Sequence, residues 1–274
     1  MNKIKTAGVV VVLWLSATVG QATTFVTDIE PWGLWTASTE SVTDAIAHEQ
    51  WQALLDAYLR TDTADGIYRF DYGAVSKSDR QRLQAYLGSL TAIDPRNYPR
   101  SQQLPYWINL YNALTVAVVL EHYPVSSIRK IYGGLFNTGP WDETLIEVAG
   151  VGLSLNDIEH RILRPIWRDP RIHYAVNCAS LSCPNLAADA YTASNVERLL
   201  DEGARAYINH PRGVAVAADR IVASSIYDWY QGDFGGSESA LVTHWLAFAE
   251  QELAAALQAV DGRFSYQYDW NLNE

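Results

Sequence analysis

Residues 171–186 are the most unusual segment of the chain for the side chains that could do chemistry. The segment RIHYAVNCASLSCPNL holds both cysteines, Cys178 and Cys183, together with His173, two asparagines and two serines. Residues 172–178 are rich in β-forming side chains and predict a strand. A strand that runs into a turn rich in serine and asparagine often carries reactive groups, because such turns expose backbone N–H groups. We therefore expect any chemistry of this protein to be centred here.

Two cysteines with four residues between them admit three interpretations. In an oxidising compartment Cys178 and Cys183 can close a small loop as a disulfide. Alternatively, Cys178 is a thiolate nucleophile, which needs a nearby imidazole or helix N-terminus to lower its pKa from about 8.5. The third interpretation is a metal site that uses both thiols and His173. A single cysteine pair is a weak zinc signal, so neither a metal nor a cofactor is predicted.

Asn109 and Asn112 are polar residues in an otherwise apolar helical stretch. They are three residues apart and hence share one face of that helix. A buried amide without partners costs about 1–3 kcal/mol, so both must belong to a polar network. We expect this face to lie against the turn at 178–186, either as a structural tie or as the lining of an active cleft.

His160 lies in the segment LNDIEHRIL, where isoleucines and leucines mark the buried side of a short helix. The imidazole is therefore expected nearer the polar side, with Asp157 and Arg164. A lone helical histidine is usually a surface residue. As a group that titrates near neutral pH, it would also suit a cysteine as general base.

The elements that must position these residues follow from hydrophobic periodicity. Helical patterns cover residues 42–59, 76–90 and 104–122, and the third is apolar nearly all round, which predicts a buried central helix. The second half mixes strands with helices, at 144–149 (strand), 156–163 (helix), 194–208 (helix), 214–223 (hairpin), 241–257 (helix) and 264–270 (extended). Without a regular βαβ alternation, this order favours a single α+β domain in which the central helix packs on a small, largely antiparallel sheet.

Residues 1–22 have the order of a secretory signal peptide. Lys3 and Lys5 precede an apolar run, and Gly20 and Ala22 supply the small residues that a signal peptidase needs. The run is shorter than the roughly 20 residues that span a bilayer, so we expect cleavage and no stable membrane insertion. The mature domain, residues 23–274, would then be periplasmic or extracellular.

The charge of the predicted mature chain excludes some partners. It carries 18 basic residues against 31 acidic ones, an excess that repels phosphate backbones and disfavours nucleic acid. The chain also has 10 Trp and 16 Tyr, which fill cores and can stack on a peptide or glycan ligand. The sequence names no particular partner and no oligomeric state.

Three sequence blocks occur in an order that resembles a known family. They are YWINLYNA at 106–113, LNDIEHRILR at 155–164 and IHYAVNCASLSCPNL at 172–186. Together they resemble the domain of unknown function numbered 547. The blocks SSIYDWY at 224–230 and YDWNL at 268–272 are similar to its bacterial exported members. The resemblance covers about residues 51–273, and the family name implies no activity.

The layout that this resemblance implies is similar to papain-like and transglutaminase-like folds. There, a cysteine at the start of a central helix faces a histidine on a strand. In this chain residues 106–109 would occupy the helix start, where no cysteine stands, and His173 would lie on the strand. Either Cys178 takes the nucleophile's place from another element or the site is inactive. Fold analogy alone does not establish function.

Two functions from different classes remain open. The first is a cysteine-dependent hydrolase or acyl transferase, with Cys178 as nucleophile, His160 or His173 as base, and Asn109 or Asn112 as the orienting or oxyanion-stabilising amide. The second is a non-catalytic binding or scaffold domain, in which the two cysteines form a disulfide and the Asn and His residues form a buried network.

The order of residues 1–22 predicts that the mature protein begins at Thr23. Intact-mass measurement of the protein recovered from outside the cytoplasm should give the mass of residues 23–274. Exported material that retains residues 1–22 would contradict the prediction.

Overall fold

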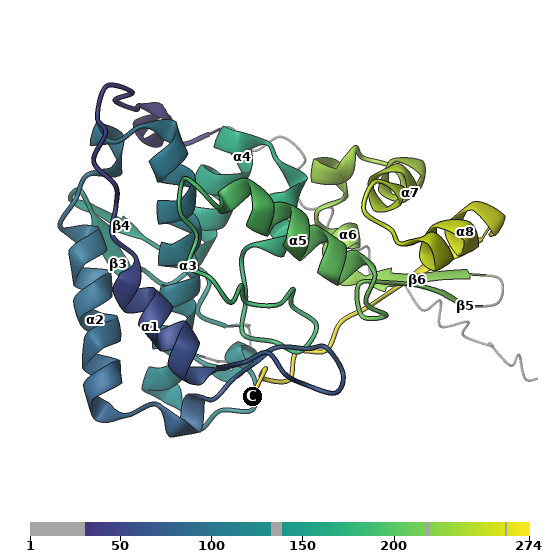
Figure 1. Cartoon of the computed structure of the whole chain (residues 1–274), viewed down its shortest axis with the longest axis horizontal. Coiled ribbons are helices and arrows are strands. Elements are labelled where there is room, and N and C mark those ends of the chain that lie inside the picture. The colour runs from purple at the N-terminus through teal and green to yellow at the C-terminus, as the bar shows by residue number, and fades with distance from the viewer. Residues whose placement is uncertain (1–30, 133–138, 218–219, 261) are drawn as a thin grey trace, which may run out of the picture.

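The computed structural model describes residues 31–132, 139–217, 220–260 and 262–274. The predicted signal peptide lies outside these residues. Helices and short strands follow one another along the chain, which confirms the α+β class (Figure 1). No helix in the described part of the chain combines the length and the apolar character needed to span a membrane.

The regular elements begin and end as follows. The α-helices are α1 (Glu49–Tyr58), α2 (Lys77–Thr91), α3 (Arg100–His122), α4 (Arg164–Trp167), α5 (Val196–Ile208), α6 (Ser225–Trp229), α7 (Glu238–Leu246) and α8 (Gln251–Ala259). The strands are β1 (Leu59–Arg60), β2 (Arg69–Phe70), β3 (Ile146–Val148), β4 (Val151–Leu153), β5 (Val214–Ala217), β6 (Arg220–Ser224) and β7 (Arg263–Gln267). A π-helical segment, Asp157–Leu163, precedes α4, and a 3₁₀ helix, Pro170–Tyr174, follows it.

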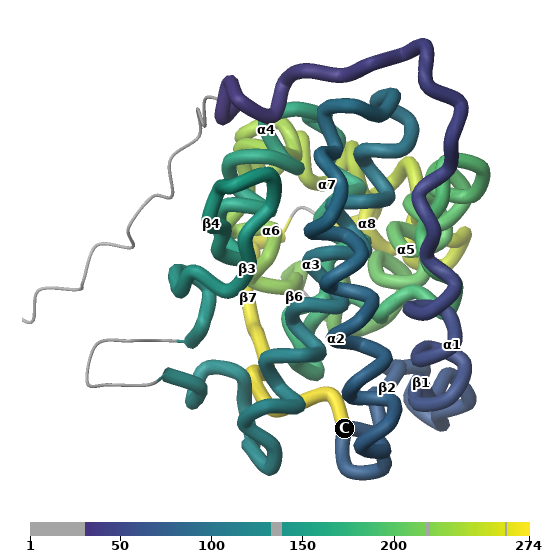
Figure 2. Tube along the Cα trace, turned by 90° about the vertical axis from the view of Figure 1, so that its left-hand side faces the viewer, coloured from purple at the N-terminus to yellow at the C-terminus, as the bar shows by residue number. Residues whose placement is uncertain are grey.

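Helix α3 is the predicted central helix, and its residues 103–120 are all buried. It runs beside α2 along the height of the molecule (Figure 2) and also packs against the π-helical segment. It begins at Arg100, one turn earlier than the pattern indicated, so Pro105 lies inside the helix. A helix that is apolar on every side needs cover all round, and here other helices supply most of it.

Three of the four strand pairings among the described residues are antiparallel. These are β1 with β2, β3 with β4, and β5 with β6, while β7 adds to β6 in parallel. The three-stranded sheet β5–β6–β7 belongs to a second core cluster, with α6, α7 and α8, and not to the cluster around α3. Helix α5 joins the two clusters, because Leu200 packs in the first and Tyr207 in the second.

The prediction of a strand at 172–178 is wrong. Asp169 accepts a hydrogen bond from the N–H of Arg171, and Pro170 stands at the first helical position, so a 3₁₀ helix forms here. Its last residues are followed by irregular backbone up to the turn. A side-chain cap and a proline together outweigh the β preference of the residues that follow.

The helix predicted at 241–257 is two helices. The break lies at residues 247–250, although apolar residues recur at helical spacing across it. Asn209 explains the break, because its amide donates to the carbonyl of Phe248 and accepts from the N–H of Glu250. These bonds replace those that a continuous helix would have made.

Two glycines give a test of the packing between α5 and the sheet. A Cβ at Gly213 would lie 1.9 Å from the carbonyl oxygen of Tyr207, so Gly213→Ala should destabilise the fold by about 1–3 kcal/mol. At Gly88, on the exposed side of α2, a Cβ meets nothing within 4 Å. There the same change should stabilise by about 0.5–1 kcal/mol. Urea unfolding of both variants measures this, and equal midpoints would contradict the described packing.

Candidate functional site

Both asparagines of α3 hold backbone of the segment that carries the cysteines. The Asn112 amide donates to the carbonyl of Ala175 (2.9 Å), and its oxygen accepts from the N–H of Asn177 (2.8 Å). Asn109 makes the same pair of bonds with Tyr191, donating at 2.7 Å and accepting at 3.0 Å. We call residues 175–191 the cysteine segment. Helix α3 therefore fixes both of its ends, before and after the turn.

Asn177 organises the turn from within. Its side chain accepts from the N–H of Ala179 (2.8 Å) and donates to the carbonyl of Pro184 (2.7 Å). Ala179 has a φ of 57°, in the left-handed region that costs a non-glycine residue about 1–2 kcal/mol. Strain of this kind persists only where surrounding contacts enforce it, and it gathers at functional sites.

The C-terminal residues cover the turn. Ser180 pairs with Leu272 as an antiparallel bridge, and the N–H of Ser182 donates to the carbonyl of Asp269 (3.1 Å). In return, the N–H of Asp269 donates to the hydroxyl of Ser182 (2.7 Å). This pairing places Tyr268, which precedes Asp269, against the cysteines.

The two cysteines are free thiols in contact. Their sulfurs are 2.8 Å apart, longer than the roughly 2.05 Å of a disulfide bond. Cys178 is half-buried and Cys183 is buried. The sulfur of Cys178 also lies 3.1 Å from the hydroxyl of Tyr268 and 3.3 Å from that of Ser180. The N–H of Cys178 donates to the sulfur of Cys183 (2.9 Å).

These contacts shift the two thiol pKa values in opposite directions. Burial raises the pKa of Cys178, but hydrogen bonds from Cys183, Ser180 and Tyr268 stabilise its thiolate and leave the pKa below the ordinary value. For Cys183, burial and the neighbouring Cys178 together raise the pKa well above that value. The pair therefore holds its first negative charge on Cys178.

His173 belongs to an ion network beside this turn. Its Nε2 atom lies 2.6 Å from a carboxylate oxygen of Asp233, which also accepts from Arg164 at 2.6 Å. Its ring stacks on Tyr230 at 4.5 Å between centroids. Burial raises the pKa of Asp233, whereas the hydrogen bonds from His173 and Arg164 lower it. The hydrogen bonds have the larger effect, so the pKa lies below its ordinary value. Asp233 is thus a carboxylate that orients the imidazole of His173.

His160 and Glu159 join the same network from the π-helical segment. The Glu159 carboxylate is buried, 3.8 Å from Nδ1 of His160 and 3.9 Å from Nδ1 of His173. Burial lowers the pKa of His160, so its imidazole favours the neutral form. π-Helical segments are rare and often occur at functional sites.

The structure thus separates the predicted site residues into two neighbouring groups. Asn109 and Asn112 hold the cysteine segment, while the hydrogen bonds described for His160 and His173 run to Arg164 and Asp233 and not to a sulfur. The two groups interact electrostatically, because the negative charge of the Glu159 carboxylate raises the pKa of Cys178. Among the described residues, no cluster of three or more His, Cys, Asp or Glu side chains is arranged to hold a metal ion.

Sequence reasoning missed the hydroxyl groups around Cys178 and the partners of His173. Tyr268 and Tyr230 do lie in the blocks YDWNL and SSIYDWY, and Glu159 lies in LNDIEHRILR. The blocks marked these residues as part of the family pattern but did not indicate what each residue does. Asp233 stands in no such block, and only the fold brings it to His173.

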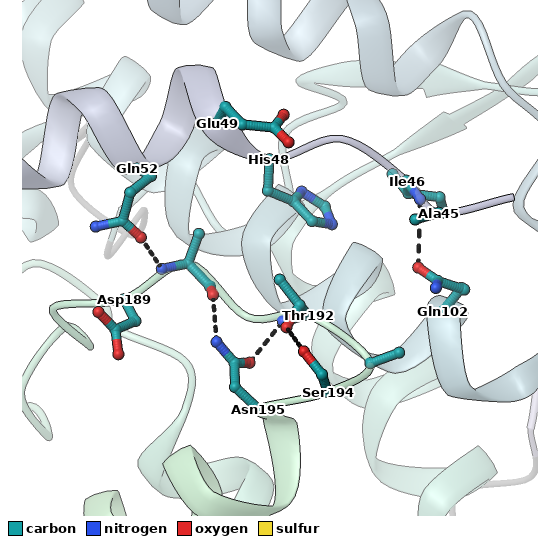
Figure 3. A pocket seen from close by; sticks show the side chains of 12 residues that line it. Ala45, Ile46, His48, Glu49, Gln52, Gln102, Asp189, Thr192, Ser194 and Asn195 are labelled. Atoms are coloured by element: carbon teal, nitrogen blue, oxygen red, sulfur yellow. Dashed lines mark hydrogen bonds between the residues drawn. The ribbon is translucent and has the colours of Figure 1, made fainter.

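A hollow of about 620 Å³ lies elsewhere, between the start of α1 and the loop that leads into α5 (Figure 3). Its lining residues include His48, Gln52 and Asn195. Burial lowers the pKa of His48 to about 4, and its Nδ1 atom lies 2.7 Å from the hydroxyl of Tyr86. None of the five predicted site residues lines this hollow, and it holds no nucleophilic thiol.

Comparison with known families bears on the central part of the chain. Residues 95–208 match the family described as "Protein of unknown function, DUF547". This match supports the resemblance seen in the sequence blocks. It covers α3, the π-helical segment and the cysteine segment, whereas Tyr230, Asp233 and Tyr268 lie beyond it. No curated protein and no solved structure matches the chain significantly.

The contacts of the two α3 amides predict large losses of stability. Asn109→Leu and Asn112→Leu should each cost about 2–4 kcal/mol, because each leaves buried backbone groups of the cysteine segment without partners. Gln84→Leu, on the exposed side of α2, is the matched control and should stay within about 0.5 kcal/mol of the parent. Thermal unfolding compares the three variants. Equal melting of Asn112→Leu and Gln84→Leu would show that these bonds contribute nothing.

Proposed function

We propose that this protein is a thiol–disulfide exchange protein, with Cys178 as the attacking thiol and Cys183 as the resolving thiol. The observation that carries the proposal is the 2.8 Å contact between two free thiols whose pKa values are shifted in opposite directions. A half-buried cysteine with a lowered pKa beside a buried one with a raised pKa suits an attack followed by an internal resolution.

The exchange proceeds in two steps. The Cys178 thiolate attacks one sulfur of a substrate disulfide, forming a mixed disulfide and releasing the other sulfur as a thiolate. Cys183 then loses its proton to that leaving thiolate and attacks the sulfur of Cys178. This forms the Cys178–Cys183 disulfide and releases the second substrate thiolate, which takes a proton from water. The substrate disulfide is reduced to two thiols, and the cysteine pair is oxidised.

The geometry supports both steps. Cys183 needs to approach Cys178 by only about 0.8 Å to reach the length of a disulfide bond. The N–H of Cys178 already donates to the sulfur of Cys183, so it stabilises the thiolate that must form for the second step. The hydroxyl groups of Ser180 and Tyr268 stabilise the thiolate required for the first step.

Exchange is better supported than acyl transfer at Cys178. A hydrolase or acyl transferase needs a base within hydrogen-bond reach of its nucleophile. The hydrogen bonds described for His160 and His173 serve Arg164 and Asp233 instead. The disulfide of the scaffold hypothesis is, in this proposal, the oxidised state of the same pair. We also propose that the protein works outside the cytoplasm, where disulfide substrates are abundant.

Reaction with a small neutral disulfide, dithiodipyridine, tests the proposal. The reduced protein should lose both thiols and end with an internal disulfide and no adduct. Cys183→Ala should accumulate one mixed disulfide at Cys178, because nothing resolves it. Cys178→Ala should react at least about tenfold more slowly, since the remaining thiol is buried with a raised pKa. Mass spectrometry of acid-quenched samples identifies each product.

The same reaction in urea is the control, because there both single-cysteine variants should react alike. A folded Cys178→Ala that reacts as fast as Cys183→Ala would overturn the assigned roles. A wild-type protein that retains a stable adduct would show that Cys183 does not resolve it.

A further inference from the structure

Tyr268 connects Cys178 to a group of partly exposed aromatic rings. The ring centroids of Trp229 and Trp270 lie 4.8 Å and 4.6 Å from that of Tyr268, and 5.6 Å from each other. Trp141 packs edge-on against Trp270 at 5.5 Å. We call these four residues the aromatic patch. Each of them is partly exposed, and the hydroxyl of Tyr268 touches the sulfur of Cys178.

The patch has the composition of a binding surface. Its rings come from three separate parts of the chain, namely the turn before β3, the end of α6 and the C-terminal residues. The Arg129 guanidinium lies 5.2 Å above the ring of Trp270. Trp, Tyr and Arg are the residues that most often dominate the energy of protein interfaces.

The charges around the patch select the type of ligand. Asp142, Glu143, Asp228 and Asp269 are exposed and lie near its residues in sequence, whereas the cations close to it among the described residues are Arg129, over the ring of Trp270, and its exposed neighbour Lys130. Glutathione disulfide, a net anion, is disfavoured by this excess of carboxylates. Apolar and aromatic side chains accompanied by Lys or Arg are favoured, through ring contacts and ion pairs.

We propose that the aromatic patch binds the polypeptide that flanks a substrate disulfide, so that the substrate is a protein or peptide disulfide. This proposal rests on the proposed thiol–disulfide exchange. A sulfur that reaches Cys178 must bring its flanking residues near Tyr268. Because one extended residue spans about 3.3–3.6 Å, residues one to three positions from the substrate cysteine lie over Trp229 and Trp270.

Two disulfide-linked peptides test the preference. One carries Trp, Leu and Lys next to its cysteine, and the other carries Ser and Asp at the same positions. The reduced protein should react with the first at least about tenfold faster than with the second or with glutathione disulfide. Trp270→Ala should reduce the ratio of the two peptide rates by about tenfold. Trp229→Ala is the second variant, in case the first fails to fold.

Trp167→Ala is the matched control. Trp167 is also partly exposed, but it ends α4 and makes no described ring contact with the patch. Its variant should keep the wild-type ratio. Equal rates for the two peptides, with Cys178 still reacting with dithiodipyridine, would overturn the patch while leaving the exchange function in place. A Cys178 that reacts with none of these disulfides would overturn both.

Discussion

Two side-chain amides inside one buried helix determine where the turn that carries both cysteines lies. Asn109 and Asn112 bind backbone groups at the two ends of the cysteine segment. A buried amide and a buried peptide group each need hydrogen-bond partners. Here the helix and the segment supply these partners to each other, so a movement of either one alone would break the bonds. This constraint holds the turn against α3 and lets Ala179 keep a left-handed conformation inside it.

The state of the thiols follows from that fixed turn. Once the turn is in place, the C-terminal residues pair with it and bring Tyr268 to Cys178. Burial and the Glu159 charge both oppose a thiolate, and the hydrogen bonds to Cys178 outweigh them. The pKa of Cys183 is shifted in the opposite direction, because this thiol is buried and because it donates to the same charge. The surroundings alone thus give two identical side chains different pKa values.

Sequence reasoning succeeded where the cause is local. The apolar run of α3 predicted its burial, and two amides in such a run implied a polar network. The strand expected at 172–178 failed because Asp169 and Pro170 initiate a helical turn, and the break at 247–250 depends on Asn209, about 40 residues away along the chain. Tyr268 is 90 residues from Cys178. Hydrophobic periodicity cannot predict a contact between residues so far apart in the sequence. The contacts of Tyr268 with Cys178 and of Asp233 with His173 are therefore found only from the fold.

The pH dependence of alkylation at Cys178 tests the central claim most directly. Iodoacetamide reacts with the thiolate, so the rate rises with pH through the pKa of the group it labels. With the pKa of Cys178 lowered, the midpoint of that rise should lie below the midpoint for free cysteine. In Tyr268→Phe it should move upward, because one donor to the thiolate is lost. Site-resolved mass spectrometry measures the rates. A midpoint at or above that of free cysteine, unchanged in Tyr268→Phe, would contradict the account.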